Sequence, residues 1–142
     1  MQFKNILTVC VGNICRSPTA EYLLKQACPE LKVHSAGLSA MVNHPADDKA
    51  QHCMSQIGIN MAEHRARQIN ATLLKEADLI LVMSQNQQNH IEKNWPFTKG
   101  KIFRLGHWQN CNIADPYQHD QVFFNQTFQL IQQCTQDWKQ YF

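Results

Sequence analysis

A cysteine and an arginine are separated by five residues near the start of the chain, within the segment CVGNICRS at 10–17. A loop of this length can curl so that successive backbone N–H groups point inward, and Gly12 and Asn13 are residue types that tolerate a positive φ. Inward N–H groups hold an anion, and the planar guanidinium of Arg16 can bind two phosphate oxygens. The pattern therefore predicts a phosphate-binding loop that comprises Val11, Gly12, Asn13, Ile14, Cys15, Arg16 and Ser17.

The same setting favours a reactive sulfur at Cys10. Inward N–H groups, a helix N-terminus and an arginine all stabilise a thiolate, which is the nucleophilic form of cysteine. Ser17 could cap the following helix or donate its hydroxyl to the thiolate, and the residues alone leave both roles open. A buried apolar role for Cys10 at a strand end is the alternative, but the strand-to-helix context favours a nucleophile.

A thiolate that cleaves a phosphate ester also needs a proton donor for the departing oxygen. A positioned acid accelerates such a step by about 10²–10⁴-fold. Asp115 could supply it from the triplet Asp115-Pro116-Tyr117, which lies in a polar stretch after the last predicted strand. By itself the triplet favours only a turn, because Asp-Pro commonly starts turns.

The elements that must position these residues follow from the hydrophobic pattern. Short apolar runs predict buried parallel strands, and apolar residues at three- and four-residue steps predict helices between them. The predicted strands are 6–9, 31–35, 79–83 and 102–105. Four helices are predicted: the first starts at Ser17, the second spans 46–57 and ends before Gly58, and the third follows strand 79–83 and reaches about Lys93. The last helix contains Phe124, Phe128, Ile131, Cys134 and Trp138.

Strands that alternate with helices predict an α/β fold, formed as a single domain over 1–142. We expect a small doubly wound sheet of four parallel strands, in the order 2-1-3-4, flanked by helices on both faces. Ligands of such sheets bind at the carboxyl ends of the strands, which is where Cys10 lies.

Composition excludes several other classes of protein. The 13 Lys and Arg residues are scattered and the formal charge is +2, so no nucleic-acid partner is expected. No apolar run reaches membrane-spanning length and the start lacks signal-peptide features, which predicts no membrane insertion and a cytoplasmic location. The six cysteines and seven histidines show no spacing typical of a metal site, so neither a metal nor another cofactor is expected.

The stretch ILTVCVGNICRSPTAE at 6–21 strongly resembles the signature of the low-molecular-weight protein tyrosine phosphatases. The resemblance continues in order through Ser35-Ala36-Gly37, Ala66-Arg67-Gln68-Ile69 and Asp115-Pro116-Tyr117. It implies an enzyme that hydrolyses phosphotyrosine through a cysteinyl-phosphate intermediate, without a cofactor.

The resemblance also implies a role for each matching residue. Cys10 would be the nucleophile, Arg16 the phosphate clamp and Asp115 the general acid, which reverses the turn-only interpretation of its triplet. Cys15 would be a redox partner that traps the oxidised nucleophile as a disulfide, although packing under the loop is an equally good interpretation. The implied supporting hydrogen-bond network is Asn13, Ser17, Ser35 and His64, and the implied rim of the substrate pocket is Tyr117 and Leu38.

Other activities on the same fold remain alternatives. Relatives that act on phosphoarginine carry threonine where this chain has Ile14, so the bulkier side chain favours tyrosine. An arsenate reductase should carry relay cysteines near the third strand, and the region 79–94 has none. A non-catalytic phosphate-binding module would not need Cys10, Arg16 and Asp115 together, and a nucleotide-triphosphate loop would end in Gly-Lys-[Ser/Thr].

The segment Leu105-Gly106-His107-Trp108, followed by Asp115-Pro116-Tyr117, is most similar to bacterial phosphatases paired with tyrosine autokinases of capsule and exopolysaccharide export. The resemblance implies a phosphotyrosine protein as partner, namely the tyrosine-rich tail of a membrane-bound autokinase, and inhibition by phosphate- and vanadate-type oxyanions. One departure is Ser84, where many relatives have an acidic residue after the third strand; the sequence therefore leaves open whether this position contacts the loop.

Overall fold

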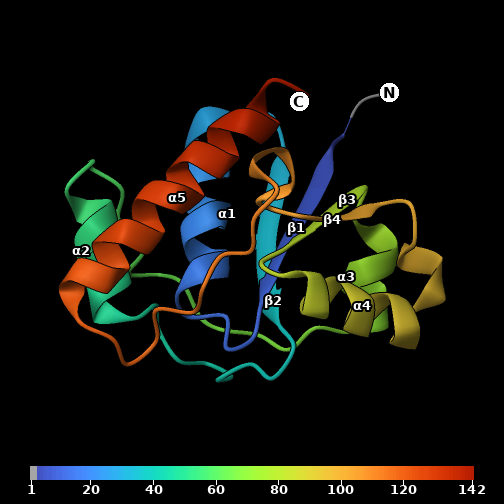
Figure 1. The fold of residues 1–142 in the computed structure, drawn as a ribbon, viewed down its shortest axis with the longest axis horizontal. Coiled ribbons are helices and arrows are strands. Elements are labelled where there is room, and N and C mark those ends of the chain that lie inside the picture. The colour runs from blue at the N-terminus through green and yellow to red at the C-terminus, as the bar shows by residue number, and fades with distance from the viewer. Residues whose placement is uncertain (1–2) are drawn as a thin grey trace.

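A computed structural model describes residues 3–142, so the first two residues of the expected 1–142 domain lie outside it. Four strands form one parallel sheet in the order β2-β1-β3-β4 (Figure 1). The strands are β1 (Asn5–Cys10), β2 (Lys32–Gly37), β3 (Leu79–Val82) and β4 (Ile102–Arg104). The expected α/β architecture and strand order are confirmed, with strand ends that differ from the predicted ones by up to two residues.

Helices cover both faces of the sheet, as expected of a doubly wound fold (Figure 1). One face carries α1 (Arg16–Ala27), α2 (Asp48–Ser55) and α5 (Gln121–Lys139), and the other carries α3 (Ala71–Glu76) and α4 (Gln85–Asn94). Two short 3-10 helices, η1 (Pro96–Thr98) and η2 (His107–Gln109), lie in the connections around β4. None of the helices described for residues 3–142 is long and apolar enough to cross a membrane.

Alternation along β1 explains why its sequence is almost continuously apolar. Ile6 and Cys10 belong to the core under α1 and α5, whereas Leu7 and Val9 belong to the core under α3 and α4. Because both faces are covered, both sets are mostly apolar, and the buried polar residue Thr8 donates its hydroxyl to the Ser17 carbonyl at 2.9 Å. The strand therefore lies at the centre of the sheet, and Cys10 is the residue at its carboxyl end.

Two helices differ from the sequence-based expectation. Helix α2 is two residues shorter at each end than the predicted 46–57, because the side chain of Asp47 accepts a hydrogen bond from the N–H of Lys49 and caps the helix there. Helix α3 was not predicted. It has only six residues, and its one local signal is Asn70, whose side chain accepts from the N–H of Leu73.

Candidate active site

The loop that joins β1 to α1 turns its carbonyl groups outward. Four of these carbonyls accept hydrogen bonds of 2.8–3.0 Å from N–H groups of residues 38–47; they belong to Cys10, Val11, Gly12 and Ile14. In contrast, the N–H groups of residues 12–15 donate to no acceptor within the described part of the chain. Because the outward side is bonded and the N–H groups are free, the loop can offer a row of donors to an anion.

Asn13 holds the shape of this loop. Its backbone has a φ of 59°, in the left-handed region that asparagine tolerates, whereas Gly12 does not have a positive φ. The Asn13 side-chain amide donates to the hydroxyls of Ser17 at 2.8 Å and Ser35 at 2.9 Å. The ring of His64 donates from Nε2 to the Asn13 carbonyl at 2.7 Å. The structure thus brings together all four residues of the expected network.

Ser17 lies next to the sulfur of Cys10 and does not cap the helix. Helix α1 begins at Arg16, its N-cap is Cys15, and no side chain caps it. The capping role considered for Ser17 is therefore wrong, because the residue is already inside the first turn. Its hydroxyl lies 2.9 Å from the Cys10 sulfur instead.

A buried carboxylate that sequence reasoning missed completes the network behind the loop. Glu21 is 6% exposed and accepts a hydrogen bond of 2.5 Å from the hydroxyl of Ser35. It also forms an ion pair with Lys25 at 2.6 Å, and its oxygen lies 3.9 Å from Nδ1 of His64. Its position in 6–21, on the same helical face as Ser17, was the available signal.

Arg16 and Asp115 face each other across the mouth of the loop. Their Nη2 and Oδ2 atoms are 3.5 Å apart, and Arg16 Nη1 donates to the carbonyl of Ile113 at 2.9 Å. The arginine is buried, whereas the Asp115 side chain is 48% exposed. Arg16 Nε is buried without a hydrogen-bond partner in the described part of the chain. An oxyanion in the loop could supply that partner, because a guanidinium binds oxygen pairs through neighbouring N–H groups.

A cleft of about 200 Å³ opens over the loop. Cys10, Arg16 and Asp115 all line it, so the structure brings the three expected catalytic residues to one cavity. Tyr117 forms part of its wall, and Met41 forms another part.

Leu38, the other expected rim residue, is not among the residues that line the cleft. Its side chain packs on the core under α3 and α4, because residues 38–41 run beside the loop and turn Met41 inward instead. The sequence singled out the right segment but the wrong side chain.

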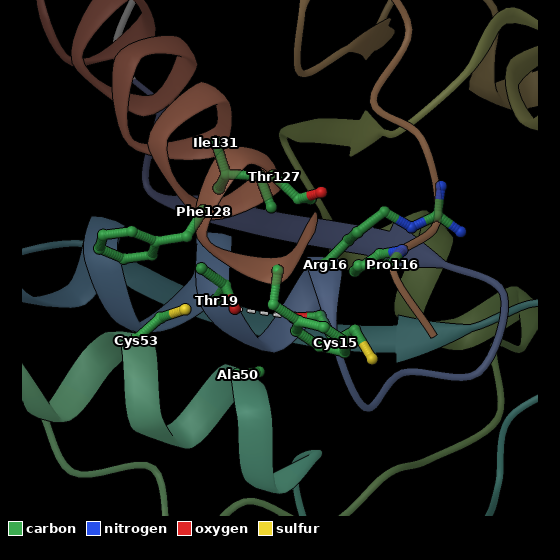
Figure 2. A pocket seen from close by; sticks show the side chains of 10 residues that line it. Cys15, Arg16, Thr19, Ala50, Cys53, Pro116, Thr127, Phe128 and Ile131 are labelled. Atoms are coloured by element: carbon green, nitrogen blue, oxygen red, sulfur yellow. Dashed lines mark hydrogen bonds between the residues drawn. The ribbon is translucent and has the colours of Figure 1, made fainter. Parts of the chain in front are cut away.

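Behind the loop lies a smaller apolar cavity of about 10 Å³, which has room for about one water molecule. Figure 2 shows residues of α1, α2 and α5 around it, together with Pro116. Cys15 and Arg16 line both this cavity and the cleft, whereas Cys10 and Asp115 line only the cleft. The three expected catalytic residues therefore all line the cleft, and only Arg16 among them also lines the smaller cavity.

The environment of Cys15 differs from that of Cys10. Burial, and next the carboxylate of Asp47, raises the pKa of the Cys15 thiol far above its ordinary value. The thiol is therefore protonated near neutral pH and is a weak nucleophile there. Both cysteines line the cleft, but of the two only Cys10 has its sulfur within hydrogen-bond distance of a hydroxyl, that of Ser17.

Two further expectations concern residues away from the loop. Ser84 caps α4, with its hydroxyl accepting from the N–H of Gln87 at 3.3 Å, and no hydrogen bond joins it to the loop within residues 3–142. No group of three His, Cys, Asp or Glu side chains in that same range is arranged to hold a metal ion.

Comparison with known proteins gives matches along nearly the whole chain. A family model described as low molecular weight phosphotyrosine protein phosphatase matches residues 5–141. A low molecular weight protein-tyrosine-phosphatase, Ptp, from Acinetobacter johnsonii is 69% identical over 138 residues, which cover 97% of each chain.

Solved structures agree with this chain in fold. The tyrosine phosphatase Wzb from Escherichia coli K30, in complex with sulphate, has a TM-score of 0.95 at 35% identity and 99% coverage of both chains. Vibrio vulnificus Wzb in complex with benzylphosphonate also has a TM-score of 0.95, at 34% identity, covering 99% of this chain and 100% of that one.

Proposed function

This chain belongs to the low molecular weight phosphotyrosine protein phosphatase family and is a protein-tyrosine-phosphatase, and we propose that its reaction proceeds through phosphate held covalently on Cys10. One observation carries the proposal. The N–H groups of residues 12–15 have no acceptor within residues 3–142, while the loop carbonyls are bonded outward around the Cys10 sulfur. A row of free donors next to a thiol is suited to hold a phosphoryl group for attack by sulfur.

In the first step the Cys10 thiolate attacks phosphorus in line with the bond to the leaving oxygen. The loop N–H groups and Arg16 stabilise the charge on the three equatorial oxygens. Asp115, as the protonated acid, gives its proton to the departing phenolic oxygen. Its exposed carboxyl at the cleft mouth suits this role, because the leaving group must exit toward solvent.

In the second step the Asp115 carboxylate accepts a proton from a water molecule. That water attacks phosphorus, the bond to the Cys10 sulfur breaks, and inorganic phosphate and the thiolate are released. Ser17 supports both steps by donating its hydroxyl to the sulfur, from which it is 2.9 Å away. Phosphate and vanadate bind the same loop and inhibit, because they present the same oxygens.

The substrate is an aryl phosphate. Tyr117 offers a flat apolar wall to a phenyl ring, and Ile14 fills the loop position where a threonine accompanies activity on phosphoarginine. A benzylphosphonate bound to the Vibrio vulnificus relative supports this choice, because that molecule joins an aromatic ring to a phosphate-like group.

The physiological partner we propose is the phosphorylated tyrosine-rich tail of a bacterial tyrosine autokinase that acts in capsule or exopolysaccharide production. Its support is the resemblance of residues 105–108 and 115–117 to phosphatases paired with such kinases. The enzyme would meet the tail in the cytoplasm, at the inner membrane. A reducing compartment also suits a catalytic thiol.

The decisive experiment is an assay in EDTA with phosphotyrosine, phosphoserine and phosphoarginine peptides of one sequence. We expect hydrolysis of the phosphotyrosine peptide, inhibition by vanadate, and no turnover by Cys10→Ser. The serine variant should still bind phosphate, which separates loss of the nucleophile from unfolding. Turnover by Cys10→Ser, or a preference for phosphoarginine, would refute the proposal. Arsenate-dependent oxidation of thiols would instead favour the reductase alternative.

A further inference from the structure

Exposed apolar side chains line the cleft, and a further one follows its wall in the chain. Val11 is 40% exposed, Tyr117 is 37% exposed, and Val42, which directly follows Met41 of the cleft wall, is 53% exposed. We refer to Val11, Met41, Val42 and Tyr117 as the apolar rim. Such a group of exposed apolar side chains next to a binding cleft is typical of a contact surface.

The segments that surround the mouth carry no formal charge of their own. Residues 10–15, 38–44 and 116–119 contain no Lys, Arg, Asp or Glu. Among the residues that line the cleft, only Arg16 and Asp115 are charged, and they face each other at 3.5 Å. Apart from Arg16, the cleft and these segments therefore have no Lys or Arg that could receive an acidic side chain on either side of a phosphotyrosine, and the exposed His44 and His119 carry no charge in their neutral form.

Cations of the neighbouring segments are engaged elsewhere. Arg67 donates to the Ser35 carbonyl at 2.9 Å and to the His34 ring at 2.6 Å. Arg65 donates to backbone carbonyls of residues 62 and 64, and Lys49 lies over the ring of Phe124. The carboxylate of Asp47 adds a negative charge near the loop, where it contributes to the raised pKa of the Cys15 thiol.

The rim is also rigid enough to discriminate between substrates. The N–H groups of Ser39 and Met41 donate to loop carbonyls at 3.0 Å, and the side chain of Gln68 bonds to both Leu38 and Ala40. Asn43 closes the segment with an N–H bond of 2.9 Å to the Ala66 carbonyl. A preformed surface contributes more to binding, because less conformational entropy is lost.

We infer that the apolar rim binds uncharged apolar side chains adjacent to the phosphotyrosine in sequence and disfavours acidic ones. The inference rests on the proposed function and extends it to the substrate chain on either side of the phosphorylated residue. An apolar neighbour buries surface against Val42 and Tyr117, whereas an acidic neighbour loses water there without gaining a partner. In a segment with several phosphotyrosines, removal of one phosphate would then raise kcat/KM for the phosphotyrosine next to it, because its neighbour would no longer be charged.

The test compares kcat/KM for three phosphotyrosine peptides that differ only beside the phosphotyrosine, with leucine, alanine or glutamate, and for phenyl phosphate. We expect the leucine peptide to exceed the glutamate peptide by about fivefold to tenfold, mainly through KM, from partial burial of one side chain on each flank. Equal values for the three peptides, with phenyl phosphate hydrolysed normally, would overturn the inference alone. Failure to hydrolyse phenyl phosphate would instead contradict the proposed function.

A substitution in the apolar rim provides a second test of the inference. Val42→Lys should reduce the preference for leucine over glutamate, because the new ammonium can pair with the acidic neighbour. The matched control is Ile57→Lys, which adds the same charge at a 39% exposed residue beside Leu23 and Lys139, away from the cleft. Each ratio is taken within one variant, so a change in folded fraction cancels. An unchanged ratio in Val42→Lys, or the same change in Ile57→Lys, would overturn the inference.

Discussion

The hydroxyl oxygen of Ser17 lies 2.9 Å from the sulfur of Cys10 and accepts a hydrogen bond of 2.8 Å from the side-chain amide of Asn13. Because the Asn13 amide is a donor, the hydroxyl hydrogen of Ser17 is left to point at sulfur. The arrangement therefore leaves Ser17 able to donate to Cys10, and a sulfur in the thiolate form can only accept that bond.

Ser17→Ala should reduce kcat for phosphotyrosine by about tenfold to a hundredfold, which corresponds to the loss of a hydrogen bond to a charged group. Rapid alkylation of Cys10 by iodoacetate should slow in parallel, because the thiolate loses its donor. Thr135→Val is the control: it removes a buried hydroxyl from α5, far from the loop, and should leave both rates unchanged. Unaltered rates in Ser17→Ala would contradict the role given to this contact.

Asp115→Asn should lower kcat most for substrates whose leaving group is a poor one. An amide cannot give a proton to the departing oxygen, so alkyl phosphates and unsubstituted phenyl phosphate should slow by about 10²–10⁴-fold. A nitrophenyl phosphate, whose phenoxide leaves readily, should slow much less.

Leaving groups of graded acidity separate this role from a merely structural one. If Asp115 acted only through its 3.5 Å contact with Arg16, its substitution would lower the rates for all substrates by the same factor. A uniform decrease across the series would therefore remove Asp115 as the acid.

The sequence predicted the parts of the site whose geometry is local. A continuous apolar strand, a glycine- and asparagine-containing loop and a helix start follow one another in the chain, so Cys10 and Arg16 could be placed without knowledge of the fold. The two central strands, β1 and β3, followed from nearly continuous apolar runs, because a strand covered on both faces leaves no alternation to misread.

Features that depend on contacts between distant segments could not be predicted. Met41 rather than Leu38 enters the cleft because backbone bonds to the loop orient that turn. Glu21 was given no role from the sequence, because its burial depends on the approach of Ser35 and His64 from distant segments. The position of Ser17 inside α1, rather than at its cap, depends on where the loop ends.

Mild peroxide should convert Cys10 and Cys15 into a disulfide in the wild-type enzyme. Peroxide oxidises the Cys10 thiolate to a sulfenic acid, and the Cys15 sulfur then displaces water, losing its proton. Because burial raises the pKa of Cys15, this second step should be slow near neutral pH and faster as the pH rises.

Mass spectrometry of peroxide-treated protein measures the outcome directly. Activity should return with dithiothreitol in the wild type, whereas Cys15→Ala should accumulate Cys10 sulfinate and lose activity permanently. Cys53→Ala is a suitable control, because Cys53 is another buried cysteine but does not line the cleft. Sulfinate at Cys10 without any bridge in the wild type would show that Cys15 only packs under the loop.

His34 links the stability of the protein to pH through a contact next to the loop. Burial, and next the charge of Arg67, lowers the pKa of His34 from 6.5 to about 4. The ring accepts from Arg67 at Nδ1 and pairs through Nε2 with the Asn5 side chain, so it is neutral in the folded chain. Between pH 6.5 and 4 the unfolded chain holds the extra proton, and folding stability therefore falls as the pH is lowered through that range.

His34→Gln should remove this dependence, since glutamine can accept from Arg67 but does not take up a proton. Urea unfolding at pH 7, 6, 5 and 4.5 should show that the wild type loses about 1–2 kcal/mol more than the variant, after allowance for the half-exposed position of the ring. His52→Gln, which changes an exposed histidine of α2, should retain the wild-type slope. Parallel slopes for the wild type and His34→Gln would mean that His34 is as easily protonated in the folded chain as in the unfolded one.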